Sequence, residues 1–176
     1  MRVIAGTYRG RILQAPKGVE TRPTSDRVRE AIFSILQDVS GARVLDLFAG
    51  SGALGIESLS RGAAEASFVD SSTAAVSVIR ANLKSLELGG AVLQLPALRA
   101  LTCTQIAAGK YDLVFLDPPY RLAGPLGAEL SDALPPLLGT DARVVTESDR
   151  RTPLELALPI LRERQYGDTL IRIYAT

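Results

Sequence analysis

The sequence predicts an α/β fold: one mostly parallel, seven-stranded sheet with an antiparallel C-terminal strand, plus a small N-terminal β-hairpin arm. From residue 43 onward, short apolar runs alternate with helical patterns across glycine or proline turns. This alternation is typical of a parallel sheet covered on both faces. Near the C-terminus, two strand-like runs flank the turn Gly167-Asp168, which indicates an antiparallel pair.

The overall composition fits one globular domain with a small appendage. The chain has 176 residues, of which 47% are hydrophobic and 22% are charged. It has no histidine, which excludes a histidine general base, a Ser-His triad and a histidine metal site. The single cysteine, Cys103, excludes an internal disulfide, and we expect no metal. Because no apolar leader or membrane-spanning run is seen, we expect a cytoplasmic location, with a monomer as the default.

The N-terminal part of the chain is basic. Residues 1–29 carry a formal charge of +5 and the remaining residues sum to −4, which suggests a polyanionic partner. Two short strands are expected within residues 2–13, so that residues 1–23 form a hairpin arm followed by a turn-rich link. Arg9 and Arg11 lie on or beside its second strand, where they fit phosphate contact. A solvated edge strand is the alternative reading of this segment.

A helix is expected after the link, as the first element of a domain spanning residues 24–176. Thr24 or Ser25 suits the N-cap and Asp26 the first turn, and Gly41 ends the element. Its core face carries Val28, Ala31, Ile32, Ile35, Leu36 and Val39. The arginines near its start could meet phosphates or could pair with Asp26 and Glu30; they are Arg22, Arg27 and Arg29.

The rest of the chain follows the strand–helix alternation. The expected strands are residues 43–48, 66–70, 91–95, 111–117, 142–146, 161–166 and 169–174. One helix is expected to end near residue 61, and a second to span residues 73–86. A weak helix is expected over residues 98–108, and another over about 125–138 with an interruption at Pro135-Pro136. These elements predict the doubly wound sheet.

A glycine-rich loop joins the first strand of this series to its helix. Gly50, Gly52 and Gly55 fit the pattern G-x-G-x-x-G, and Asp70 follows at the end of the next strand, where an acid binds ribose hydroxyls. The pattern favours an adenosine-containing cofactor. Asp46 favours S-adenosylmethionine over NAD, because a carboxylate before the glycines suits an ammonium better than a pyrophosphate. An Asx-type cap is the structural alternative for these aspartates.

The run from Tyr111 ends in Asp117-Pro118-Pro119-Tyr120. Two prolines stop the strand and leave a carboxylate, free carbonyl groups and an aromatic ring at its end. Oxygen acceptors and a stacking ring can hold a flat base that carries an exocyclic amine. The alternative is a strand followed by a simple Pro-Pro turn.

These motifs together resemble a known family. The segments 46–52 and 117–120 resemble those of S-adenosylmethionine-dependent amino-methyltransferases. Arg2-Val-Ile-Ala-Gly6, Arg9-Gly-Arg-Ile-Leu13 and Thr21-Arg-Pro-Thr24, followed by residues 26–33, are similar to the RsmD family. That family methylates N2 of a guanine in bacterial 16S ribosomal RNA. The resemblance covers nearly the whole chain and implies a Rossmann-like class I methyltransferase fold.

The resemblance also implies roles for individual residues. S-adenosylmethionine would be held by Asp46, Phe48, Ala49, Gly50, Ser51, Gly52, Asp70 and Ser71. The guanine amine would be held by the catalytic residues Asp117, Pro118 and Tyr120. The 16S rRNA, free or in an assembling small subunit, would contact Arg9, Arg11, Arg22, Arg27, Arg29 and Pro119. Relatives usually carry Asp or Asn after the third strand for the adenine, whereas this chain has Leu95-Pro96-Ala97, so a backbone group is expected there.

Other function classes remain open at this point. The nearest is an amino-methyltransferase acting on another RNA, on DNA or on a protein glutamine. Glutamine enzymes typically have Asn where Asp117 stands, and DNA enzymes usually add a recognition domain. An NAD-dependent oxidoreductase is disfavoured by Asp46 and by the lack of room for a substrate domain. A non-catalytic RNA-binding module would have no need for three aspartates at strand ends.

Overall fold

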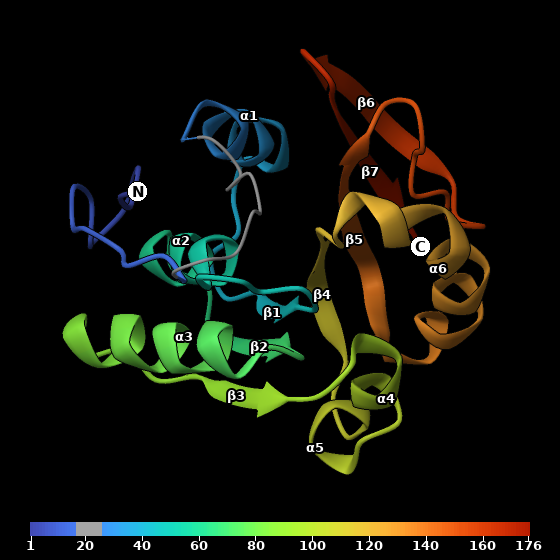
Figure 1. The fold of residues 1–176 in the computed structure, drawn as a ribbon. Coiled ribbons are helices and arrows are strands. Elements are labelled where there is room, and N and C mark those ends of the chain that lie inside the picture. Colours follow the sequence, from blue (N-terminus) through green and yellow to red (C-terminus); the bar gives the residue numbers. More distant parts are fainter. Residues whose placement is uncertain (17–25) are drawn as a thin grey trace.

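The computed structural model describes residues 1–16 and 26–176, except the side chains of residues 120–122 (Figure 1). The strands are β1 Arg43–Asp46, β2 Glu65–Asp70, β3 Ala91–Gln94, β4 Tyr111–Leu116, β5 Leu138–Asp149, β6 Ile160–Tyr166 and β7 Thr169–Ala175. The helices are α1 Asp26–Leu36, α2 Ala53–Ser60, α3 Thr73–Ser85, α4 Ala97–Leu101, α5 Thr104–Ala107, α6 Tyr120–Ala133 and the 3-10 turn η1 Pro135–Leu137.

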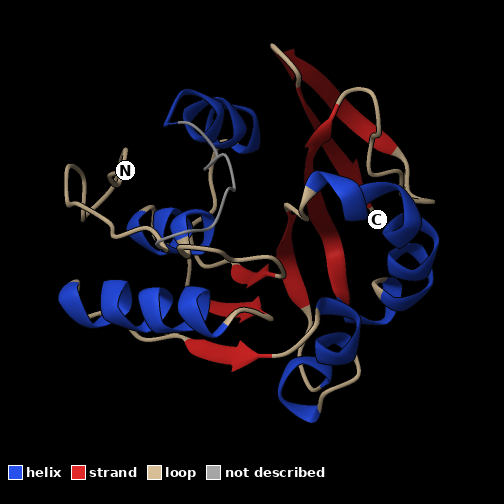
Figure 2. Cartoon of the chain, viewed as in Figure 1, coloured by secondary structure: helices blue, strands red, loops and turns tan. Residues whose placement is uncertain are grey.

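The strands form one sheet in the order β3-β2-β1-β4-β5-β7-β6. β1 to β5 run parallel to one another, while β7 is antiparallel to both β5 and β6 (Figure 2). The predicted seven-stranded sheet with an antiparallel C-terminal strand is therefore confirmed. Because β1 and β4 are central neighbours whose chains continue to opposite sides, their carboxyl ends form the point where a doubly wound sheet opens a crevice.

Helices cover the sheet on two sides (Figure 1). One apolar cluster joins the sheet to α1, α2 and α3, and its strand residues include Val44, Phe115 and Val145. The other joins the opposite face to α4, α5, α6 and η1 around Leu45 and Val114. Successive residues of a strand point to opposite faces, so membership of these clusters shows which face each strand residue occupies. None of the helices described here is long and apolar enough to cross a membrane.

The predicted N-terminal β-hairpin arm is not supported, for two reasons. Only a single antiparallel bridge, Arg2 to Ile12, forms where two strands were expected. The segment also packs onto the body, because Val3 and Leu13 are buried in the cluster beneath α1 to α3. The segment still folds back on itself, since Val3 N–H donates to Arg11 O and Leu13 N–H to Met1 O. Ile4 N–H and Ala5 N–H donate instead to Glu57 on α2, which holds the segment against the body.

Several other elements begin or end at residues different from those expected from the sequence. The weak helix expected over residues 98–108 is two short helices, α4 and α5, that meet at Cys103. α6 begins at Tyr120, earlier than expected, and contains Pro125. β5 is longer than predicted because β7 pairs with it as far as Asp149. The expected cap at Thr24 or Ser25 lies outside the described residues.

Candidate active site

Three aspartates meet at the carboxyl edge of the sheet. Asp46 is in register with Phe68 on one side and with Phe115 on the other. Asp70 follows Phe68 by two residues on β2, and its side chain and that of Asp46 lie on the α1–α3 side. Asp117 directly follows the end of β4, two residues after Phe115, so it lies at the same edge. The strand registers bring these three acids to one edge of the sheet, as the strand–helix alternation predicts.

The loop after β1 turns through left-handed backbone conformations. Gly50 has φ +54° and Gly52 has φ +78°, a region that glycine adopts far more readily than other residues. A Cβ on Gly50 would meet no atom within 4 Å, so the backbone faces open space there. Gly55 differs, because a Cβ there would lie 2.3 Å from the Phe68 ring and its role is close packing of α2 on β2.

Asp70 holds this loop against the end of β2. Its Oδ2 accepts a hydrogen bond from Gly50 N–H at 2.8 Å, and its Oδ1 accepts one from Ser72 N–H at 2.8 Å. Asp70 therefore does act as an Asx-type cap, but it is only half-buried, so part of the side chain remains open to a ligand. The structural role and the proposed ribose contact are compatible.

Asp46 lies deeper and is 2% exposed. Burial raises the pKa of its carboxyl to about 7, the N–H of Gly55 lowers it, and the charge of Asp70 raises it further. Gly55 N–H donates to Asp46 Oδ2 at 3.2 Å. A buried carboxylate is costly without a countercharge, so this position favours a cationic ligand group.

The Asp-Pro-Pro-Tyr segment connects β4 to α6. Asp117 is half-buried, Pro118 is buried and Pro119 is exposed at the N-cap of α6. The backbone is therefore fixed between a core strand and a helix, which suits a site that must hold a substrate amine. The side chain of Tyr120 lies outside what the structure describes, so its stacking role remains a prediction.

The remaining expected cofactor residues surround the same loop. Ala49 and Ser51 are buried, Phe48 is half-buried and Ser71 is exposed. Ala49 N–H donates to Val69 O at 3.0 Å, which ties the loop to β2. After β3, Leu95 is half-buried and its N–H already donates to Asp70 O at 3.2 Å.

Sequence reasoning missed Glu147. Leu116 is in register with Thr146, so Asp117 and Glu147 follow on adjacent strands at the same edge. Glu147 pairs with Ile171 and shares the face of Val145, on the α1–α3 side, where it is 5% exposed. The apolar run of this strand was expected to end at residue 146. Glu147 directly follows this run and is an acid at a strand end, like Asp46, Asp70 and Asp117. That position is the signal in the sequence that could have identified it.

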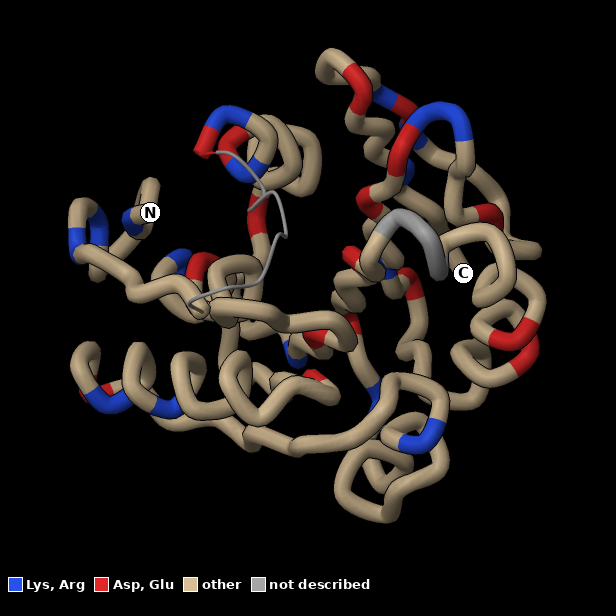
Figure 3. Tube along the Cα trace, in the orientation of Figure 1, with Lys and Arg blue, Asp and Glu red and all other residues tan. Residues whose placement is uncertain are grey.

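The predicted RNA-contacting arginines separate into two groups. Arg9, Arg11 and Arg27 are exposed, and Figure 3 shows basic residues on the N-terminal loop. Arg29 is fully buried, and donates to Asp26 Oδ1 at 2.9 Å and to Arg2 O. The guanidinium of Arg29 is therefore not exposed for contact with RNA. Its hydrogen bonds link α1 to the N-terminal residues. Arg22 lies outside the described residues.

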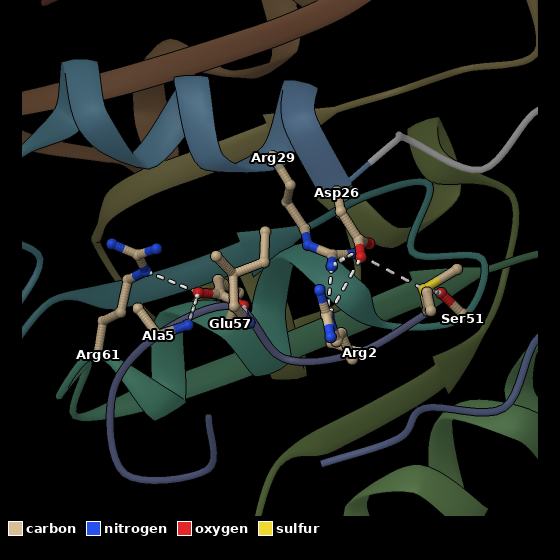
Figure 4. A network of polar contacts seen from close by, with 9 residues as sticks. Arg2, Ala5, Asp26, Arg29, Ser51, Glu57 and Arg61 are labelled. Atoms are coloured by element: carbon tan, nitrogen blue, oxygen red, sulfur yellow. Dashed lines mark hydrogen bonds and ion pairs between the residues drawn. The ribbon is translucent and has the colours of Figure 1, made fainter. Parts of the chain in front are cut away.

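A polar network fixes the N-terminal residues beside α2 (Figure 4). The buried Glu57 carboxylate accepts from Ile4 N–H at 2.8 Å, from Ala5 N–H at 3.0 Å and from Arg61 Nε at 2.8 Å. Ser51 Oγ donates to the sulfur of Met1 at 3.3 Å. The first residues of the chain thus reach the glycine loop.

Two cavities lie away from this edge. One of about 620 Å³ is lined by Tyr8, the start of β2 and Gly89-Gly90. Another of about 260 Å³ is lined by Leu36, residues 38–42 and the start of β4. Both are at the amino ends of the parallel strands, opposite to the carboxylates, so the chemistry argued above does not involve them.

Comparison with known proteins gives matches over the full chain. The family described as Conserved hypothetical protein 95 matches residues 1–175. The Bacillus subtilis (strain 168) protein named "Putative rRNA methyltransferase YlbH" is 42% identical over 99% of this chain and 98% of its own length. Ribosomal RNA small subunit methyltransferase D of Escherichia coli (strain K12) is 41% identical, over 69% of this chain and 61% of its own length.

Solved structures share this fold. The structure described as "Putative methyltransferase yhhF from Escherichia coli" has a TM-score of 0.84 and 35% identity, covering 99% of this chain and 97% of that one. An RNA methyltransferase from Salinibacter ruber, solved with S-adenosyl-L-homocysteine, has a TM-score of 0.66 and 18% identity, covering 87% and 92%. At that identity the second likeness concerns the fold alone. The fold is that of class I methyltransferases.

Proposed function

Since the chain belongs to the RsmD/YlbH family, the family described as Conserved hypothetical protein 95, we propose that it is an S-adenosylmethionine-dependent rRNA methyltransferase. We propose further that its target is the exocyclic N2 amine of a guanine in 16S rRNA. The observation that carries this proposal is the placement of Asp46, Asp70 and Asp117 at one edge, around an open glycine loop.

The residues present fit the cofactor. Asp46 offers a buried carboxylate to the ammonium of the methionine end, and that pairing would offset the cost of its burial. Gly50 offers backbone with no side chain in the space before it. Asp70, half-buried at the end of β2, suits the ribose hydroxyls. For the adenine, residues 95–97 supply apolar surface and backbone groups in place of the usual acid or amide.

The chemistry that the bound cofactor supplies is an electrophilic sulfonium methyl group. The guanine N2 lone pair is delocalised into the ring, so the amine is a weak nucleophile and must be oriented. The Asp117 carboxylate and the Pro118 carbonyl would accept its two N–H groups and direct the lone pair at the methyl. Methyl transfer would form a C–N bond as the S–C bond of the donor breaks, and Asp117 or water would accept the extra proton from N2. Holding both reactants together can supply roughly 7–11 kcal/mol of the barrier.

Glu147 gives this site a reason to prefer guanine. The Watson–Crick edge of guanine carries N1–H beside the N2 amine, and a carboxylate accepts from such donors. Glu147 follows Thr146, which is in register with Leu116, and Asp117 follows Leu116. In this proposal the two carboxylates would accept from adjacent donors of one base edge. Glu147 also interacts within the protein, so the base edge would join or replace that interaction.

The base must leave its stack to reach this edge, and Tyr120 is proposed to stack on it. Phosphate contacts are proposed for Arg9, Arg11 and Arg27, with Arg22 kept from the sequence pattern. In this proposal residues 1–16 contact RNA as part of the body, not as a projecting arm. The substrate implies action in the cytoplasm, and a monomer would suffice for the chemistry.

The test is mass mapping of 16S rRNA from a strain that lacks this protein. One N2-methylguanine should disappear and should return when the wild-type chain is supplied, but not when Asp117→Asn is supplied. Unchanged 16S rRNA in the deletion strain would refute the assignment.

A further inference from the structure

We infer that Asn82 is a positioning residue that couples the cofactor loop to the N-terminal RNA-contacting segment, so that S-adenosylmethionine and RNA strengthen each other's binding. This inference rests on the proposed function and deepens it. Neither the glycine pattern nor the Asp-Pro-Pro-Tyr pattern includes Asn82, which lies on α3. Its place in the hydrogen-bond network is what singles it out.

The side-chain amide of Asn82 joins two segments far apart in sequence. Asn82 is 1% exposed. Its Nδ2 donates to Ser51 O at 2.9 Å, on the cofactor loop, and to Gln14 O at 3.1 Å. Gln14 N–H donates back to Asn82 Oδ1 at 2.8 Å. The amide therefore pairs with the backbone of Gln14 on both its donor and its acceptor side, and the same group holds the carbonyl of Ser51.

A second link connects the same loop to the start of α1. Ser51 Oγ donates to Met1 Sδ at 3.3 Å, and Arg29 Nη1 donates to the same sulfur at 3.6 Å (Figure 4). Asp26, the first residue of α1, accepts from Arg29 at 2.9 Å. Gln14 and Asp26 thus lie on either side of residues 17–25, the stretch to which Arg22 belongs. Gln14 is joined to Ser51 through the side chain of Asn82. Asp26 is joined to Ser51 through the side chains of Arg29 and Met1.

Ser51 is placed so that a ligand on the loop affects these links. It lies between Gly50 and Gly52, which both have positive φ, and Asp70 holds the Gly50 N–H. A cofactor that fixes the loop would also fix Ser51 O and, through Asn82, the backbone of Gln14. RNA bound to the N-terminal segment would fix Gln14 and act in the reverse direction. Thermodynamic linkage requires the two effects to be equal.

The competing interpretation is that Asn82 only satisfies buried backbone groups and supports the fold. In that case a variant would weaken each ligand separately but leave the ratio of affinities unchanged. Coupling is measured by that ratio: the dissociation constant of S-adenosylhomocysteine without 16S rRNA divided by the constant with saturating 16S rRNA. A purely structural role does not change it.

The experiment compares full-length wild type with Asn82→Asp, which keeps the acceptor for Gln14 N–H but loses both donors. Ser85→Ala is the control, because it removes a hydrogen bond on α3, from Ser85 Oγ to Asn82 O, without touching the loop. Gln14→Pro is a second variant, since it deletes the Gln14 N–H and leaves α3 intact. S-adenosylhomocysteine and in vitro transcribed 16S rRNA are the probes, with calorimetric titration as the measurement.

We expect 16S rRNA to tighten S-adenosylhomocysteine binding about fivefold or more in wild type and in Ser85→Ala. The ratio should fall close to one in Asn82→Asp and in Gln14→Pro. A wild-type ratio of one, or variants that keep the wild-type ratio, would overturn the inference. Wild type that binds S-adenosylhomocysteine but no 16S rRNA would overturn the proposed RNA substrate itself, and the coupling with it.

Discussion

Asp46 is in register with Phe115, two residues before Asp117, so the two acids lie at the carboxyl ends of adjacent strands. Under the proposed function, the methionine end of the cofactor and the amine of the substrate base would bind at these neighbouring strand ends. The position between them is where a transferred methyl would have to lie.

The pKa of Asp46, raised to about 7 by burial, makes stability and cofactor binding depend on pH in opposite directions. The unfolded chain loses this proton near pH 4 while the folded chain keeps it to about 7, so the free energy of unfolding should fall as pH rises across that window. Cofactor affinity should rise about tenfold per pH unit up to about 7, because the ammonium needs the carboxylate. Asp46→Asn should flatten both profiles, measured by urea unfolding and calorimetric titration. Profiles that keep their slopes in this variant would contradict the assignment.

The Gly50 backbone is predicted to contact the cofactor directly. Gly50→Ala should cost about 1–2 kcal/mol of stability because φ is +54°, and should weaken S-adenosylhomocysteine binding about tenfold or more, since the new methyl enters the ligand space. Gly10→Ala is the matched control, with φ +82° and equally open surroundings away from the site. It should lose similar stability and no affinity. Equal affinities of the two variants would show that Gly50 does not face the ligand.

Glu147 is predicted to read the N1–H of guanine. Replacing the modified guanine, once mapped, by 2-aminopurine keeps the 2-amine but removes N1–H. Wild-type kcat/KM should then fall about ten- to hundredfold. Glu147→Gln should be slower on guanine but should discriminate little between the two bases, whereas Glu129→Gln, an exposed change on α6, should behave as wild type. Discrimination by Glu147→Gln as strong as in wild type would exclude this role.

The exposed arginines of the N-terminal segment are predicted to bind phosphates. Arg9→Ala and Arg11→Ala should each weaken 16S rRNA binding and reduce the salt dependence of log K by about 1, with cofactor affinity unchanged. Arg151→Ala, exposed near the C-terminal strands, is the control. Point variants serve better than truncation, because Val3 and Leu13 belong to the core. An unchanged salt slope in both variants would remove these residues from the interface.

Much of this fold follows from local patterns. The strands around Val44 and Phe115 and the helix containing Ile79 are apolar at the period of their element, so their existence and order could be predicted from sequence. The edge at which Asp46, Asp70 and Asp117 meet follows from the same alternation.

What could not be predicted depends on contacts between distant segments. The docking of residues 1–14 relies on side chains of α2 and α3, chiefly Glu57 and Asn82, whose partners are backbone groups 52 to 68 residues away. The burial of Arg29 has the same origin, because its partners include the backbone of Arg2. An arginine beside other arginines gives no local sign that it is a core residue.

The most direct test is methylation of 16S rRNA, presented free and in small-subunit particles, with labelled S-adenosylmethionine, followed by digestion and mass analysis of the nucleosides. Wild type should yield labelled N2-methylguanosine. Asp117→Asn should lose at least a hundredfold in rate while binding the cofactor normally, because the group that orients the amine and offsets its developing charge is gone. Asp132→Asn, an exposed acid on α6, should remain active. Label in any other nucleoside, or normal methylation by Asp117→Asn, would contradict the account.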